Sequence, residues 1–121
     1  MPLRLGKATV ADEALESIVR GAVASVSGAR LDAPGRVARV LPGRRGPVEW
    51  QADRASIAFD VDISAAYGRV LPELAVAVRD AVAGHVAQMT GLEVRAVDVT
   101  VTEVARHEGG EGANDRDEAG E

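Results

Sequence analysis

Polar residues whose oxygens could bind a cation or move a proton alternate with apolar residues in two stretches of the chain, 56–64 and 93–104. Hard cations and acid–base pairs need such oxygens, but they need them in a shaped loop or a cleft. Neither stretch carries a loop signature, so we predict a solvated face with no metal and no catalytic residue. This face is our candidate interaction surface: Asp60, Asp62, Asp98, Thr100 and Thr102.

Nucleophilic catalysis finds little support in the residue types. Cysteine is absent, and no serine occupies a G-x-S-x-G turn. His85 falls on the apolar side of an expected helix, where a packed histidine is the commoner role, and His107 begins the C-terminal tail. No phosphate-binding loop, dinucleotide fingerprint or zinc spacing occurs either. We therefore expect a non-enzymatic protein without a cofactor.

One basic turn supports an alternative function, the binding of RNA. Residues 43–46 read Gly-Arg-Arg-Gly, a G-x-x-G pattern like the loop with which KH domains clamp a nucleic-acid backbone. In those domains the loop joins two helices, whereas Pro42 and Pro47 bracket it here. Residues 1–105 carry 12 basic against 13 acidic residues, so the basic excess typical of nucleic-acid binding is missing. We favour a tight turn and keep a small RNA-binding module as the alternative, its patch being Arg36, Arg39, Arg44 and Arg45.

The length and composition limit the size of the domain that positions these residues. The chain has 121 residues and only three aromatic ones, so we expect one domain, over 1–105, with a thin core rich in Ala and Val. Residues 106–121 hold six acids, two arginines and four glycines, and we predict a disordered acidic tail there. No apolar run approaches the roughly 18 residues that span a bilayer, which predicts a protein that is soluble or reaches a membrane only through a partner, without direct insertion. The absence of cysteine fits a cytoplasmic location.

Two helices follow from the spacing of apolar residues. A stripe at helical spacing runs through 15–26, and Gly28 is placed to end that helix. A second helix is expected over 71–90, with Pro72 in its first turn and Gly91 just after its end. We expect this helix to bury the following stripe: Leu71, Leu74, Val78, Ala81, Val82, His85 and Met89.

Strands are predicted where apolar and polar residues alternate. The stretches 56–64 and 93–104 are the clearest, 36–41 and 48–51 are shorter candidates, and Asp53-Arg54 is a plausible hairpin tip. Two helical stripes and one-sided strands predict an α+β fold. We expect a two-layer sandwich with both helices on one face of a small mixed or antiparallel sheet of three to four strands.

The second half of the chain also carries a recognisable pattern. A Tyr-Gly pair at 67–68 precedes the second helix, Met-Thr-Gly-Leu-Glu-Val follows at 89–94, and Val-Asp-Val-Thr-Val follows at 97–101. This pattern, with the 6–28 segment, resembles the alkaline shock protein family of Gram-positive envelope stress response proteins over about residues 6–104. The residues that carry the structural motif are Tyr67, Gly68, Pro72, Met89, Thr90, Gly91 and Leu92.

The resemblance implies a role as well as a fold. It implies a non-enzymatic cytoplasmic protein of the envelope or alkaline stress response. Such proteins self-associate or are held near the membrane by an integral-membrane partner. In this interpretation Pro72 starts the helix, Gly91 ends it, and Met89 and Leu92 pack against the core. The resemblance supplies no catalytic residues.

Overall fold

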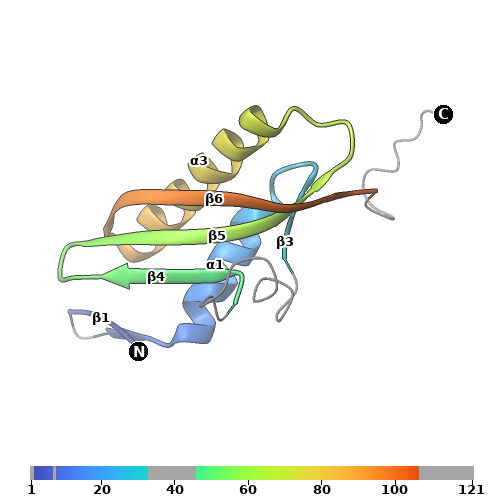
Figure 1. Ribbon diagram of the computed structural model, residues 1–121. Helices are drawn as coiled ribbons and strands as arrows, with labels where there is room; N and C mark the ends of the chain where they lie inside the picture. Colours follow the sequence, from blue (N-terminus) through green and yellow to red (C-terminus); the bar gives the residue numbers. More distant parts are fainter. Residues whose placement is uncertain (1, 7, 33–45, 107–121) are drawn as a thin grey trace.

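A computed structural model describes residues 2–6, 8–32 and 46–106. Within these ranges the chain forms two helices and six strands, in two sheets (Figure 1). In chain order the elements are β1 (Leu3–Leu5), β2 (Ala8–Val10), α1 (Asp12–Ala24), β3 (Ala29–Leu31), β4 (Val48–Ala52), β5 (Ser56–Ala66), α3 (Leu71–Thr90) and β6 (Glu93–Ala105). The predicted α+β class is confirmed.

Strand β5 organises the main sheet. On one side it pairs in parallel with β6 along its whole length. The crossover that contains α3 connects these two strands. On the other side it pairs antiparallel with β4 over its first half and with β3 over its second half. The sheet is therefore mixed, as predicted, and three strands wide at any point. Strands β1 and β2 form a separate hairpin.

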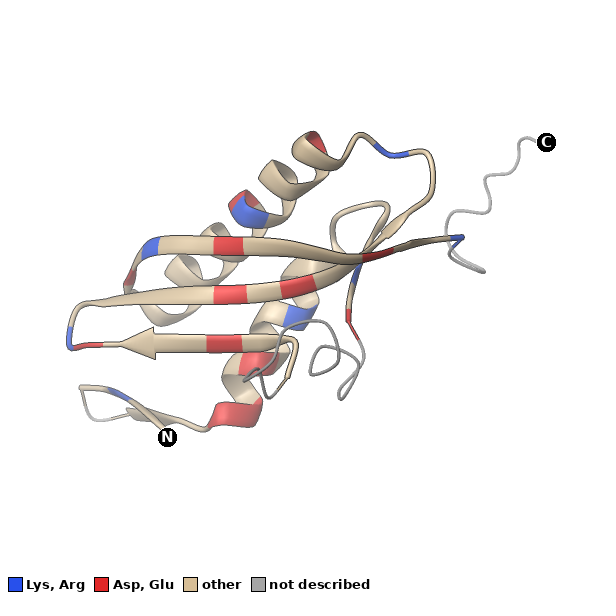
Figure 2. Cartoon of the chain, viewed as in Figure 1, with Lys and Arg blue, Asp and Glu red and all other residues tan. Residues whose placement is uncertain are grey.

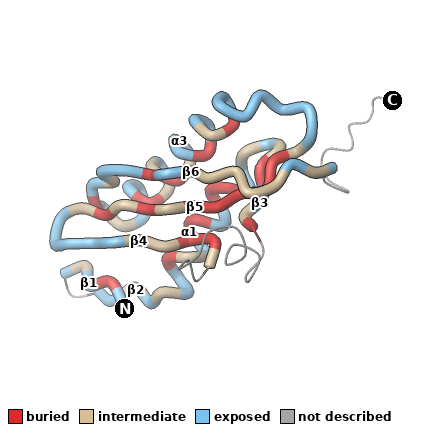
Figure 3. The backbone as a smooth tube through the Cα atoms, viewed as in Figure 1, coloured by how far each residue is buried: buried red, intermediate tan, exposed pale blue. Residues whose placement is uncertain are grey.

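Both helices cover the same face of the sheet. Helix α1 contacts α3 and β3, and α3 contacts β6 (Figure 1). Alternate residues of β5 turn toward these helices. Buried residues recur along β5, α1 and α3, as the red segments of Figure 3 show. The core is built mainly from Leu15, Val19, Ala22 and Val23 of α1, Ile57, Phe59, Val61 and Ile63 of β5, and Leu74, Val78, Val82 and Val86 of α3.

Helix α3 has the predicted bounds, but it is rotated relative to the predicted stripe. Its buried residues follow an i, i+4 row that ends at Val86, whereas Met89 is 66% exposed, so the prediction that Met89 packs is wrong. Gly91 and Leu92 of the motif have the structural roles that were predicted for them. Gly91 adopts φ +76 and donates its N–H to the Ala87 carbonyl at 2.9 Å, which ends the helix. Leu92 is buried, as predicted.

The segment after α1 differs from the prediction. The helix ends at Ala24 rather than at 26, and a turn leads into β3, a strand that the sequence pattern did not indicate. Gly28 in this turn has φ +90, and the Arg69 side chain lies directly over it. The Arg69 guanidinium donates to the Ser27 carbonyl at 2.6 Å, which ties the turn to the start of the α3 crossover.

The other predicted strands have mixed outcomes. The stretches 48–51, 56–64 and 93–104 correspond to β4, β5 and β6, each slightly longer than predicted, and the β4–β5 hairpin turns at 53–55. The 36–41 strand and almost all of the 106–121 tail lie outside the described residues. The β1–β2 hairpin was not predicted.

Candidate functional site

The candidate interaction surface lies on the face of the sheet opposite the helices. The strand register makes Asp60 the direct partner of Glu49 on β4 and of Asp98 on β6. Directly paired residues share a face, so these three carboxylates form one row across the sheet, visible as aligned red bands in Figure 2. Like charges in direct opposition destabilise strand pairing. Because Asp98 is exposed and Asp60 half-buried, water reduces that repulsion.

Asp62 does not belong to this surface. Its side chain is fully buried, so the prediction that it lies on a solvated face is wrong. Its backbone N–H donates to the Pro47 carbonyl at 2.8 Å, and its carbonyl accepts the Asp32 N–H at 2.9 Å. Asp62 therefore occupies the point where β4 and β3 meet along the edge of β5. This position encloses the residue, although alternation along β5 places it on the polar face.

Thr102 also has a structural role. Its hydroxyl donates to the carboxylate of Asp32, which is buried just after β3, and lies 3.2 Å from the Ile63 carbonyl. This contact links β6 to β3 across β5. Of the five predicted surface residues, Asp60, Asp98 and Thr100 remain as surface candidates, with Thr100 directly paired to Asp62. Sequence spacing alone could not reveal the hydrogen bond between Thr102 and Asp32, because the two residues are 70 positions apart.

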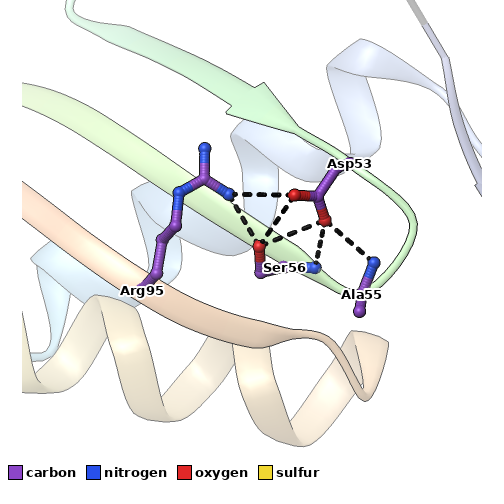
Figure 4. Close-up of polar contacts among 4 residues, drawn as sticks. All are labelled: Asp53, Ala55, Ser56 and Arg95. Carbon is purple, nitrogen blue, oxygen red and sulfur yellow. Dashed lines mark hydrogen bonds and ion pairs between the residues drawn. The ribbon is translucent and has the colours of Figure 1, made fainter.

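A second polar cluster fixes the β4–β5 hairpin (Figure 4). The carboxylate of Asp53 accepts the backbone N–H groups of Ala55 at 3.0 Å and Ser56 at 2.8 Å. The Ser56 hydroxyl donates to the same carboxylate and accepts from the Arg95 guanidinium at 2.7 Å. Arg95 lies 3.6 Å from the second Asp53 oxygen. The cluster ties the hairpin to the start of β6.

These hydrogen bonds lower the pKa of Asp53 from its ordinary value of 3.8, the N–H of Ala55 contributing most. A carboxyl whose folded-state pKa is depressed stabilises the fold above the unfolded value and loses that contribution as pH falls through the folded one. Asp53→Asn keeps an oxygen for the two N–H groups but removes the charge. We expect its Tm to lie below that of the parent chain at neutral pH, with the difference shrinking below pH 3.8. Thermal unfolding at stepped pH tests this, and a difference that is the same from neutral to acidic pH would contradict it.

Four exposed apolar residues belong to the segments that meet where β5 and β6 end and α3 begins, an end of the molecule that Figure 1 shows. Tyr67 is 76% exposed and Val70 is 56% exposed. The Tyr67 N–H donates to the Ala105 carbonyl at 3.0 Å, which holds the tyrosine beside the last residues of β6. We call this group the end patch, and it consists of Tyr67, Val70, Leu71 and Val104. The sequence pattern placed Tyr67 correctly before the second helix but gave no sign of its exposure.

One open cavity of about 540 Å³ lies between the β1 segment and the hairpin end of β4. Trp50 forms part of its apolar lining, and its ring packs against Phe59 with centroids 6.3 Å apart. The charged residues in the lining are Arg4, Asp53 and Arg54. The Asp53 carboxylate already accepts hydrogen bonds within its own turn. The described lining of the cavity therefore offers no acid–base pair.

Most of the remaining predicted residues are not tested by the described part of the chain. Arg36, Arg39, Arg44 and Arg45 lie outside the described residues, so RNA binding stays a prediction. His85 is half-buried on α3, and His107 lies outside the described residues. In the ranges 2–6, 8–32 and 46–106, no three Asp, Glu, His or Cys side chains are arranged to hold a metal ion. Neither helix that the structure describes has the length and apolar character needed to cross a membrane.

Comparison with known proteins gives one finding. The model of the alkaline shock protein 23 family, described by its cell envelope-related function, matches residues 1–106. That match spans every element described above. No curated protein and no solved structure matches the chain.

Proposed function

Because the chain belongs to the alkaline shock protein family, whose function is related to the cell envelope, we propose that it is a non-catalytic interaction module. It acts in the cytoplasm next to the membrane. It is held there by other copies of itself or by an integral-membrane protein. Its role is to present binding surfaces during envelope stress rather than to transform a substrate.

The end patch is the observation that carries this proposal. Single exposed apolar residues are common on any protein, but contiguous apolar groups mark surfaces that contact other proteins. Here Tyr67, Val70 and Leu71 are consecutive or nearly so in the chain, and the Tyr67–Ala105 hydrogen bond brings the end of β6 beside them. A tyrosine with an apolar ring and a polar hydroxyl is favoured at protein interfaces.

The arrangement of the carboxylates supports a non-catalytic role. Asp60 and Asp98 stand on a sheet face rather than in a cleft, and Asp62 is enclosed. General acid–base chemistry needs two groups directed at one reacting atom in a shielded site. The described residues offer no such convergence.

Photo-cross-linking in the native cells tests the proposal. A photoreactive phenylalanine analogue replaces Tyr67 in one chain and the exposed Glu13 of α1 in a second, matched chain. We expect the Tyr67 probe to give a product with an integral-membrane protein or with another copy, at several times the yield of the Glu13 probe. Val70→Asp should lower the yield from the Tyr67 probe, because a charge opposes burial of the patch. Equal yields from the two probes, or a Tyr67 yield that Val70→Asp leaves unchanged, would contradict the proposal.

A further inference from the structure

Strand β6 has one long edge that no other described strand pairs with. It runs for 13 residues, and among the described residues it pairs with β5 alone (Figure 1). An unpaired strand edge presents N–H and C=O groups that another strand can bind, so proteins usually protect it with Lys, Pro, bulges or a covering element.

The middle of β6 lacks most of that protection. The register shifts place one extra residue of β6 at Arg95 and another at Thr102. Between them, residues 96–101 keep an uninterrupted register against β5. This run contains no Lys and no Pro, and its single charge is Asp98.

The direction of the free backbone groups follows from the pairing of β5. Asp62 directs its N–H and C=O toward β4 and β3, so its neighbours Val61 and Ile63 direct theirs toward β6. In a parallel pair a residue bonds to the two residues that flank its partner, and Val99 is the partner of Val61. The backbone N–H and C=O groups of Asp98 and Thr100 therefore point toward β5. Alternation turns the N–H and C=O groups of three residues toward the open edge: Val97, Val99 and Val101.

From this arrangement we infer that β6 pairs antiparallel with β6 of a second copy of this chain, across a two-fold axis at Val99. The inference specifies the surface for the self-association branch of the proposed function, and it rests on that function. A closed two-fold contact makes the two edge strands antiparallel. It would join the two sheets into one continuous sheet.

Charge selects the position of the axis. Paired residues share a face, so the axis must pass through a residue, and Asp98, Val99 and Thr100 are the central choices. An axis at Asp98 would set two carboxylates in direct opposition. An axis at Thr100 would pair Asp98 with Thr102, whose hydroxyl already binds Asp32.

An axis at Val99 avoids both conflicts. It pairs Asp98 with the partner's Thr100, whose hydroxyl can donate to the carboxylate. It also pairs Val97 with the partner's Val101 and Val99 with the partner's Val99, and these residues carry the outward N–H and C=O groups. Any axis through a residue pairs outward groups with outward groups, so the hydrogen bonds allow this register and the side chains select it.

A shallow groove lies beside this axis. It has a volume of about 200 Å³ and runs between α3 and the residues 97–99 of β6. Val76 of α3 lines the groove and is 44% exposed although it is apolar. In the pairing we propose, the core-facing valines of the partner's strand approach this groove and cover Val76.

The absence of cysteine in the chain allows a direct test of the register. One chain carries Asp98→Cys and another carries Thr100→Cys. A directly opposed, non-hydrogen-bonded pair brings Cα atoms to about 4.5 Å, within disulfide range. Mixed under mild oxidation, the two chains should form an interchain disulfide at least about tenfold faster than either chain alone. Because the Thr100→Cys chain keeps Asp98, its cross-linking to itself as fast as the mixture would overturn the register.

Sedimentation of the full chain over a range of concentrations tests the contact itself. We expect a dimer that Val99→Pro weakens by about tenfold or more, because proline removes an outward N–H that the monomer does not use. Val76→Asp, which leaves the strand intact, should also weaken the dimer and decides the matter if the proline variant misfolds. A chain that stays monomeric, or a dimer that both variants leave unchanged, would overturn the inference. A successful Tyr67 cross-link to a membrane protein would then leave the proposed function standing.

Discussion

Phe59→Ala is expected to lower the free energy of unfolding by about 3–5 kcal/mol. Phe59 is the only phenylalanine of the chain, and its side chain is 2% exposed at the centre of β5. It faces the helices and also packs against the Trp50 ring. Small domains have unfolding free energies of about 5–15 kcal/mol in total, so this one change removes a large share. A core built mostly from Ala and Val has few long side chains nearby that could fill the cavity.

Urea unfolding followed by circular dichroism measures the loss, and two variants control it. Phe59→Leu keeps most of the apolar volume and should cost less than half as much. Tyr67→Ala removes an aromatic ring that is exposed and should change the free energy of unfolding by no more than about 0.5 kcal/mol. If Phe59→Ala and Tyr67→Ala had equal effects, the assignment of the core to the helix-covered face of β5 would be wrong.

The role of Phe59 was predictable from sequence, because local alternation decides which face of a strand is apolar. The same rule placed Asp60 and Asp98 on one face, and the register confirms that they are partners. Alternation does not say how deeply a residue on that face is enclosed. Asp62 is buried because two strands from distant parts of the chain meet beside it, and that depends on tertiary pairing.

Strand β3 illustrates the same limit. Three residues are too few to show a period of two, so Ala29–Leu31 had no detectable pattern. The strand exists because its backbone pairs with β5 at Ala29–Ala65 and Leu31–Ile63. The β1–β2 hairpin is equally short. The end patch was missed for a related reason, since exposure at the end of a sheet depends on where the covering layer stops.

Val86→Asp and Met89→Asp together test the rotation of α3, which sequence alone left ambiguous. From Val82 the apolar row can continue to His85 and Met89 or to Val86, and both choices fit a period of 3.6 residues. The structure selects Val86, which is fully buried, and leaves Met89 mostly in solvent. Val86→Asp would bury an unpaired carboxylate, so we expect a loss of more than about 4 kcal/mol, enough to unfold much of the chain.

Met89→Asp is the matched control, because it introduces the same residue one turn further along the same helix. Its only expected cost is a negative charge near the helix C-terminus, about 0.3–1 kcal/mol. Far-ultraviolet circular dichroism and urea unfolding of the two variants give the comparison. Equal losses would mean that α3 presents the Met89 face to the sheet. The groove beside β6 would then be lined differently, because the rotation that buries Val86 also determines how Val76 lies against the residues 97–99. The orientation of this helix therefore decides both the core and the edge through which we propose that two copies meet.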